Sequence, residues 1–193
     1  METEQLVDFL KQNPLLSVYS DNELNDLIRA AHLETVSAGK LIFDEGEPGD
    51  TFYLLYSGRI RILHRDENDK EINLGILTAG DHFGETALIT DNPRNAAARA
   101  VDDSVLIAID RQSFRRHLLA TPDQRAYFDT FIRYTSIHRF LKSCTDLSAV
   151  PPRELKELVI SFKPEFFKAG DVVFRQGTKP DKFYLIETGK TKV

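Results

Sequence analysis

The sequence predicts an α+β fold, a β-barrel or jelly roll of about eight antiparallel strands, with flanking N-terminal helices and a C-terminal helix pair. Three observations predict it. Short apolar segments broken by glycine and aspartate fill residues 40–109, which is typical of a small sandwich or barrel. Helical periodicity appears on both sides of that region. The C-terminal part then repeats the beginning of the chain, which indicates the start of a second copy.

The first helical signal runs from about Asp21 to Leu33, and Ser20 or Asp21 can cap its start. The apolar period then changes to two, which favours strands because successive side chains point to opposite faces. The expected strands are Lys40–Phe43, Thr51–Tyr56, Arg59–His64, Ile72–Ile76 with Leu74 on the same face, Ala96–Ala100 and Ser104–Ile109.

Two helices are expected after the strands. The first, Gln112–Leu119, is short, and the second begins at Thr121-Pro122 and continues to about Ser143, since proline is favoured in a first helical turn. The longer helix carries the aromatic residues Tyr127, Phe128, Phe131 and Tyr134. Packing into the core is the simpler interpretation of this set, and closure over a ligand is the alternative.

An internal repeat appears at a constant offset. Its matching pairs are Phe9-Leu10-Lys11 with Phe140-Leu141-Lys142, Glu23-Leu24 with Glu154-Leu155, Ala38-Gly39 with Ala169-Gly170, Phe52-Tyr53-Leu54 with Phe183-Tyr184-Leu185, and Gly58 with Gly189. Such self-similarity indicates a duplicated structural unit. The expected organisation is one complete domain over residues 1–143 and the first part of a second, truncated copy over residues 144–193, within a longer tandem-domain protein.

Composition narrows the function classes. The formal net charge of −5 argues against the basic face of a nucleic-acid-binding domain. The single cysteine, Cys144, allows no internal disulfide, and no apolar run is long enough to span a membrane. The histidines do not cluster at metal-ligand spacing, and no nucleophile–base pair or Walker-type loop is visible. We therefore expect a cytoplasmic segment that is not an enzyme and holds no metal or cofactor, whether or not its parent protein is membrane-bound.

The segment over residues 80–100 is the most informative chemically. Gly84 permits a tight turn with exposed backbone N–H groups, and a helical turn that begins at Glu85 would direct its N-terminus at an anion. The Glu85 carboxylate only accepts hydrogen bonds, which suits a sugar hydroxyl, and Arg94 offers a fork of donors that suits phosphate oxygens. Leu74 and Phe83 can supply apolar walls. These residue types together predict a nucleotide-phosphate site.

This segment closely resembles the cyclic-nucleotide-binding domain family. The family's phosphate-binding cassette has the form Phe-Gly-Glu-x-Ala-Leu, a short spacer and Pro-Arg-x-Ala, which this chain matches at residues 83–88 and 93–96. The resemblance implies that Glu85 holds the ribose 2′-hydroxyl and that Arg94 holds the cyclic phosphate together with the amides from Gly84 to Ala87. It also implies that the helix over residues 122–143 closes over the base. The expected ligand-binding residues are Leu74, Phe83, Gly84, Glu85, Thr86, Ala87, Arg94, Asn95 and Ala96.

Two cassette positions depart from the common family pattern. Asn95 stands where cAMP-selective members commonly have alanine and cGMP-selective members threonine, so base preference stays open, with cAMP the favoured ligand. Thr86 stands where leucine is frequent, and its hydroxyl is expected near the phosphate.

The resemblance implies a sensor that binds a 3′,5′-cyclic purine nucleotide and transmits binding through its C-terminal helix. Three settings are open for it. A kinase regulatory subunit fits the tandem arrangement and the cassette's glycine-to-arginine spacing, and a bacterial ABC exporter with tandem domains of this kind is the second. A transcription factor is disfavoured, because a second sensor copy follows where a DNA-binding motif would stand. The alternative function is a ligand-free scaffold for oligomerisation or interaction, and a homodimer stays open.

Overall fold

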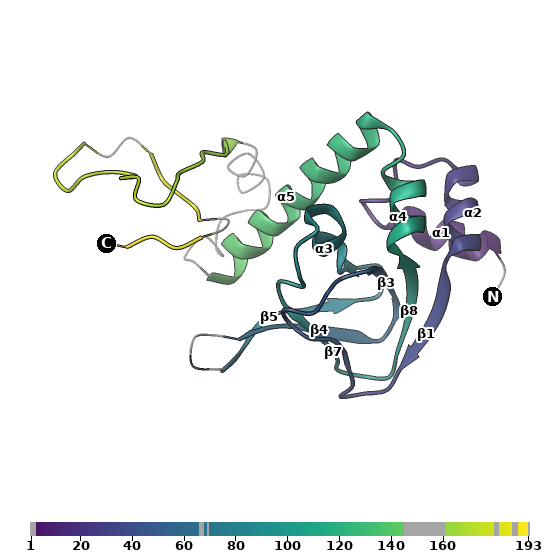
Figure 1. Cartoon of the computed structure of the whole chain (residues 1–193). Coiled ribbons are helices and arrows are strands. Elements are labelled where there is room, and N and C mark those ends of the chain that lie inside the picture. Colours follow the sequence, from purple (N-terminus) through teal and green to yellow (C-terminus); the bar gives the residue numbers. More distant parts are fainter. Residues whose placement is uncertain are drawn as a thin grey trace. The chain divides into compact units, whose positions relative to one another are not determined.

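The computed structural model of this chain describes residues 3–65, 68, 70–144, 161–179, 182–186 and 189–192. The chain divides into two compact units, Met1–Ile160 and Ser161–Val193, and the helices and strands labelled in Figure 1 belong to the first. The predicted domain boundary after residue 143 adjoins residues 145–160, which lie outside the described part of the chain. The same holds for the repeated pair Glu154-Leu155.

Eight strands in the described residues build the core of the first unit. They are β1 (His32–Val36), β2 (Leu41–Phe43), β3 (Thr51–Ser57), β4 (Arg59–Arg65), β5 (Glu71–Thr78), β6 (His82–Phe83), β7 (Ala97–Ala100) and β8 (Ser104–Asp110). They form two four-stranded antiparallel sheets, in the orders β1-β8-β3-β6 and β2-β7-β4-β5. This alternation of strands between two sheets is the jelly-roll arrangement. The predicted α+β jelly roll is therefore confirmed, and the sheets are not closed into a barrel.

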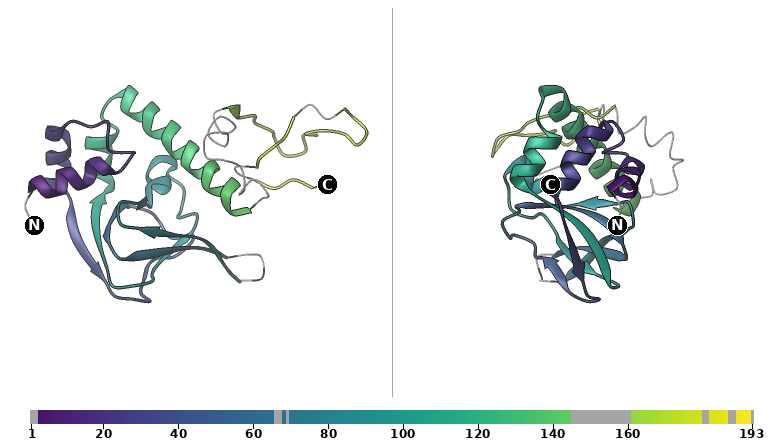
Figure 2. Two further views of the ribbon diagram at one scale, coloured as in Figure 1. Left: turned by 180° about the vertical axis from the view of Figure 1, so that it is seen from behind. Right: turned by 90° about the vertical axis from the view of Figure 1, so that its right-hand side faces the viewer.

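Within the described part of the chain, five helices accompany the sheets: α1 (Thr3–Gln12), α2 (Asp21–Ala30), α3 (Glu85–Thr90), α4 (Arg111–Leu118) and α5 (Pro122–Cys144). Helices α1, α2 and α4 lie together at one end of the sandwich, as both views of Figure 2 show. The predicted cap of α2 is confirmed, because Ser20 and Glu23 form a reciprocal capping box. None of the helices in the described part of the chain is both long and apolar enough to cross a membrane.

The predicted helix over Asp21–Leu33 was too long, and the strand after it was missed. Helix α2 ends at Ala30, and Ala31 is already extended with φ −88° and ψ 159°. Residues His32 to Val36 pair instead with β8, which lies far along the chain. Local periodicity does not reveal such a partner, so the strand could not be separated from the helix before it.

Two apolar clusters stabilise the first unit. One joins the helices to the sheet β1-β8-β3-β6. In it, Phe114 of α4 lies between Phe52 of β3 and Phe128 of α5, at ring-centroid distances of 5.2 and 5.1 Å. Phe128 is fully buried, so core packing is the correct interpretation for this member of the aromatic set. The second cluster lies between the sheets and contains the ring trio Phe43, Tyr53 and Phe83. Two members of that trio, Phe43 and Phe83, also line the pocket described below.

The second unit reproduces turns of the first but not its strands. Backbone hydrogen bonds close turns from Asp171 N to Lys168 O and from Thr178 N to Arg175 O, at 3.0 and 3.1 Å. The predicted opening strands of a second copy are absent from the described residues of this unit. The division into tandem copies stays a prediction.

The cap of α4 gives a test of the first unit's stability. Asp110 accepts hydrogen bonds from the Ser113 backbone amide and hydroxyl, each 2.9 Å long. Asp110→Ala should therefore lower the free energy of unfolding by about 1 kcal/mol, whereas Asp110→Asn keeps a good cap and should lose less. Urea unfolding of the three proteins at pH 7 measures both effects. Equal losses for the two variants would contradict a capping role.

The same variants carry a pH dependence of known sign. The backbone amide of Ser113 lowers the pKa of Asp110 in the folded state. The stability from this carboxylate is present above the unfolded-state pKa of about 3.9 and is lost as pH falls through the lower folded-state pKa. The advantage of the natural protein over Asp110→Ala should shrink below about pH 4, while the advantage of Asp110→Asn over Asp110→Ala should stay constant.

Candidate ligand-binding site

The predicted site residues come together at one pocket. It lies beside the sheet β2-β7-β4-β5 and under the start of α3, and its lining includes every one of the predicted residues from Leu74 to Ala96. Phe43 and Ile62 also line it, and sequence reasoning missed both. They are apolar residues of β2 and β4, and neither carries a signal that separates a pocket wall from ordinary core.

Arg94 lies at the back of this pocket and is only 5% exposed. Its Nη1 donates to the carbonyl of Gly84 at 2.6 Å, and its Nη2 donates to the carbonyl of Thr51 at 2.8 Å. The guanidinium carbon lies 4.0 Å from the centre of the Phe43 ring, a cation–π contact. Two backbone carbonyls and one aromatic face therefore fix the orientation of this side chain.

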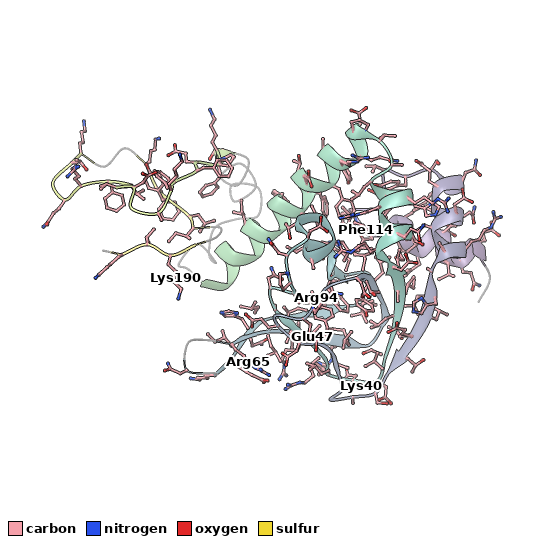
Figure 3. The ribbon with its side chains drawn as sticks, in the orientation of Figure 1. Lys40, Glu47, Arg65, Arg94, Phe114 and Lys190 are labelled. Carbon is pink, nitrogen blue, oxygen red and sulfur yellow. The ribbon has the colours of Figure 1, made fainter. Side chains whose placement is uncertain are left out.

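The backbone of Arg94 is held as firmly as its side chain. Its N–H donates to Glu47 O and its carbonyl accepts from Gly46 N, both at 2.8 Å, so the loop between β2 and β3 is tied to the cassette. Figure 3 shows Arg94 and Glu47 near each other between the sheet and α3. This backbone pairing fixes the position of Arg94 relative to the loop between β2 and β3.

The charge of Arg94 is not neutralised by an ion pair with any described residue. No carboxylate lies within ion-pair distance of it in the described parts of the chain, and its Nε is buried without a hydrogen bond. Burial lowers the pKa of Arg94, while Tyr53, Asp50 and Glu85 act in the opposite direction. Arginine stays protonated in proteins, so the fold buries a cation that no carboxylate among the described residues pairs with.

Two glycines make room for this arrangement. Gly84 has a φ of 85°, in the left-handed region, and a Cβ there would lie 2.6 Å from Arg94 Nη1. A Cβ on Gly49 would lie 2.4 Å from Ala87 Cβ and 2.9 Å from Arg94 Nε. Contacts this short exclude any side chain, so both positions require glycine for the buried guanidinium to fit.

Glu85 begins α3 and offers the opposite charge to the same pocket. Its Oε1 accepts a hydrogen bond from Thr86 Oγ1 at 3.2 Å, and its Oε2 is buried with no partner. The Thr86 hydroxyl, predicted to lie near a phosphate, is thus engaged with the neighbouring carboxylate. An ionised carboxylate only accepts hydrogen bonds, so Oε2 is a vacant acceptor that suits a hydroxyl.

A β-bulge brings Leu74 to the pocket. Ile62 pairs with Gly75 and Leu63 pairs with Asn73, which leaves Leu74 as the extra residue on β5. The expected alternation of Ile72, Leu74 and Ile76 is therefore interrupted: Leu74 lines the pocket, and the two isoleucines are exposed. The bulge depends on pairing with β4 and cannot be inferred from β5 alone.

Behind the pocket, α4 is connected to the cassette through an acidic residue. Asp91 ends α3 with a φ of 56°, a conformation that glycine adopts more readily. Its carboxylate binds Arg111 Nη1 and, at 2.7 and 3.0 Å, Arg115 Nη2. Arg111 Nη2 also donates to the carbonyls of Gly49 and Ala87, at 2.5 and 3.3 Å. One side chain of α4 thus contacts both backbone segments that surround Arg94.

None of the α5 residues whose side chains are described lines the pocket. Tyr127 instead donates its hydroxyl to the carbonyl of Pro14 at 3.0 Å, and Phe128 and Ile132 pack in the helical cluster. The predicted closure of this helix over a base is not seen in this arrangement and stays a prediction.

Comparison with known proteins matches residues 33–120, from β1 to just beyond α4, to the model of the cyclic nucleotide-binding domain. The chain is 30% identical to the cAMP-dependent protein kinase regulatory subunit of Blastocladiella emersonii over 94% of its own length and 43% of that protein. It is 24% identical to cGMP-dependent protein kinase 2 of Mus musculus over 100% of its length and 24% of that protein. The chain therefore spans less than half of each of these two relatives.

A solved structure shares the fold. The regulatory domain of Toxoplasma gondii PKA with cAMP superposes with a TM-score of 0.60 at 25% identity, over 81% of this chain and 57% of that one. The matched segment carries the pocket, both glycines and the buried arginine described above. The chain belongs, through residues 33–120, to the cyclic nucleotide-binding domain family.

Proposed function

We propose that this chain is a regulatory module that binds a 3′,5′-cyclic purine nucleotide, with the cyclic phosphate at Arg94 and the ribose at Glu85. The observation that carries the proposal is the buried guanidinium of Arg94, which has no carboxylate partner among the described residues. Burying a charge is costly unless it is paired, so an anion that enters this pocket recovers part of that cost.

The second charge of the pocket narrows the kind of anion. Glu85 presents a buried carboxylate oxygen without a donor in the pocket where Arg94 presents a cation. Like charges repel strongly where water is excluded, so this carboxylate disfavours ligands with several negative charges, such as nucleoside triphosphates. A cyclic phosphodiester carries one negative charge, and its ribose hydroxyl can donate to Glu85. These features together support a cyclic nucleotide.

The setting that we propose is a kinase regulatory subunit. The relatives named above are a kinase regulatory subunit and a cyclic-nucleotide-dependent kinase, which supports this setting over a bacterial ABC exporter. The matched family is a ligand-binding one rather than a catalytic one. A cytoplasmic location, a tandem arrangement and a homodimer stay predictions, as does the preference for cAMP over cGMP.

The role of Arg94 is testable by calorimetry. Arg94→Ala should weaken cAMP binding by about 2–5 kcal/mol, because it removes the partner of a desolvated phosphate. Arg99→Ala is the matched control: Arg99 lies on β7 and pairs with Glu71 at the partly exposed surface, so its loss changes the same net charge outside the pocket. Natural protein that binds neither cAMP nor cGMP would contradict the proposed function and favour the ligand-free scaffold.

The choice of base is expected to depend on Asn95. This exposed residue lies at the pocket and carries both a donor and an acceptor, so it can meet either purine edge. The natural protein should discriminate weakly between cAMP and cGMP, and Asn95→Ala and Asn95→Thr should shift the ratio of the two dissociation constants in opposite directions. A strong preference that both substitutions leave unchanged would contradict this prediction.

Output is proposed to pass from the cassette to α4 and α5. Asp91 forms ion pairs with Arg111 and Arg115, so a displacement of the cassette would be transmitted to α4 through these pairs. A cyclic nucleotide should change amide hydrogen exchange over residues 84–96 and also over residues 111–144. Asp91→Gly suits the positive φ but removes both ion pairs, so it should confine the change to residues 84–96. The same response of α4 and α5 in both proteins would rule out this route.

A further inference from the structure

We propose that Thr86 is a positioning residue for Glu85. Its hydroxyl holds one oxygen of the Glu85 carboxylate, so that the other oxygen stays available to a ribose hydroxyl. The inference rests on the proposed function, because it requires a sugar in the pocket. It assigns a role to one of the two positions at which this chain departs from the common cassette pattern.

The hydrogen-bond pattern of the Glu85 carboxylate carries the inference. Thr86 Oγ1 donates to Oε1 at 3.2 Å, while Oε2 is buried and has no partner. Buried acceptors are rarely left unsatisfied in folded proteins, so a vacant buried oxygen at a pocket wall marks where a ligand donor fits. The two oxygens are therefore not equivalent: Oε1 accepts a hydrogen bond within the cassette, and Oε2 has no partner among the described residues.

The pocket needs such a restraint because it contains opposite charges. Arg94 and Glu85 both line it, and their attraction favours a direct ion pair that would occupy the phosphate donor and the sugar acceptor at once. No such pair forms in the described structure. The carbonyls of Gly84 and Thr51 hold the terminal nitrogens of Arg94. On the other side, the Thr86 hydroxyl is the one donor that engages Glu85 among the described contacts.

Threonine suits this role better than the longer side chains that could occupy the second position of α3. Its branched Cβ restricts χ1, so the hydroxyl has few alternative orientations and loses little entropy when it bonds a neighbour. Valine has nearly the same shape without the donor. Substitution between the two therefore isolates the hydrogen bond from the packing.

The test is a double-mutant cycle read with two ligands. Thr86→Val should weaken the binding of cAMP by about 3-fold to 10-fold, the range expected for one hydrogen bond. It should leave the affinity for 2′-deoxy-cAMP unchanged, because that ligand lacks the hydroxyl that Glu85 would accept. In a Glu85→Ala background, Thr86→Val should have no further effect on the affinity for cAMP. With Glu85 in place, Thr86→Ser keeps the hydroxyl, so its affinity for cAMP should be close to that of the natural protein.

Three results would overturn the inference. Equal losses for cAMP and 2′-deoxy-cAMP would show that Thr86 acts only through packing, and full cAMP affinity in Thr86→Val would show that the hydrogen bond is dispensable. Natural protein that binds no cyclic nucleotide would remove the proposed function and this inference together, and the natural-protein titration alone identifies that case. Thermal unfolding of Thr86→Val without ligand confirms that the variant is folded.

Discussion

The buried guanidinium of Arg94 is the constraint on which the rest of the site depends. Arg94 is only 5% exposed, and two backbone carbonyls and an aromatic face replace part of the hydration that its guanidinium loses. Gly84 and Gly49 leave the volume that it occupies, since a Cβ at either position would lie within 3 Å of its guanidinium group. No carboxylate among the described residues pairs with this charge, and under the proposed function a ligand anion would do so.

The same pocket keeps its opposite charges apart. Glu85 and Arg94 belong to one short segment, yet hydrogen bonds to Thr86 on one side and to main-chain carbonyls on the other hold them separately. A third charge, on Asp91, is not part of the pocket lining and pairs with two arginines of α4. Arg94 and Glu85 line the pocket, while Asp91 connects the same segment to helix α4. Under the proposed function, a displacement of the cassette by a ligand would reach α4 through these ion pairs.

Sequence reasoning predicted the parts of this site that depend on local spacing and missed those that depend on pairing. The predicted residues between 83 and 96 lie close together in the sequence, so their chemistry and their resemblance to the family's cassette predicted which side chains share the pocket. Phe43 and Ile62 reach it through the jelly-roll topology and were missed, whereas Leu74 was predicted, although the bulge against β4 that brings it there was not. The strand β1 was absorbed into the preceding helix for the same reason, because its partner β8 is distant in the chain. Two-fold alternation identifies strands, but neither their partners nor their bulges.

The internal repeat separates local from non-local information within one molecule. Gly39 and Gly170 occupy corresponding positions and both adopt positive φ, 81° and 93°, and each is followed by a residue whose amide closes the same turn. Phe52 and Phe183 also correspond, yet the first is fully buried in β3 and the second is 66% exposed. Turn chemistry resides in a few adjacent residues and recurs wherever they recur. A buried strand needs neighbouring strands on which to pair, and β3 has them in β8 and β6. The repeated sequence thus reproduces the turns, while a strand also requires its partners.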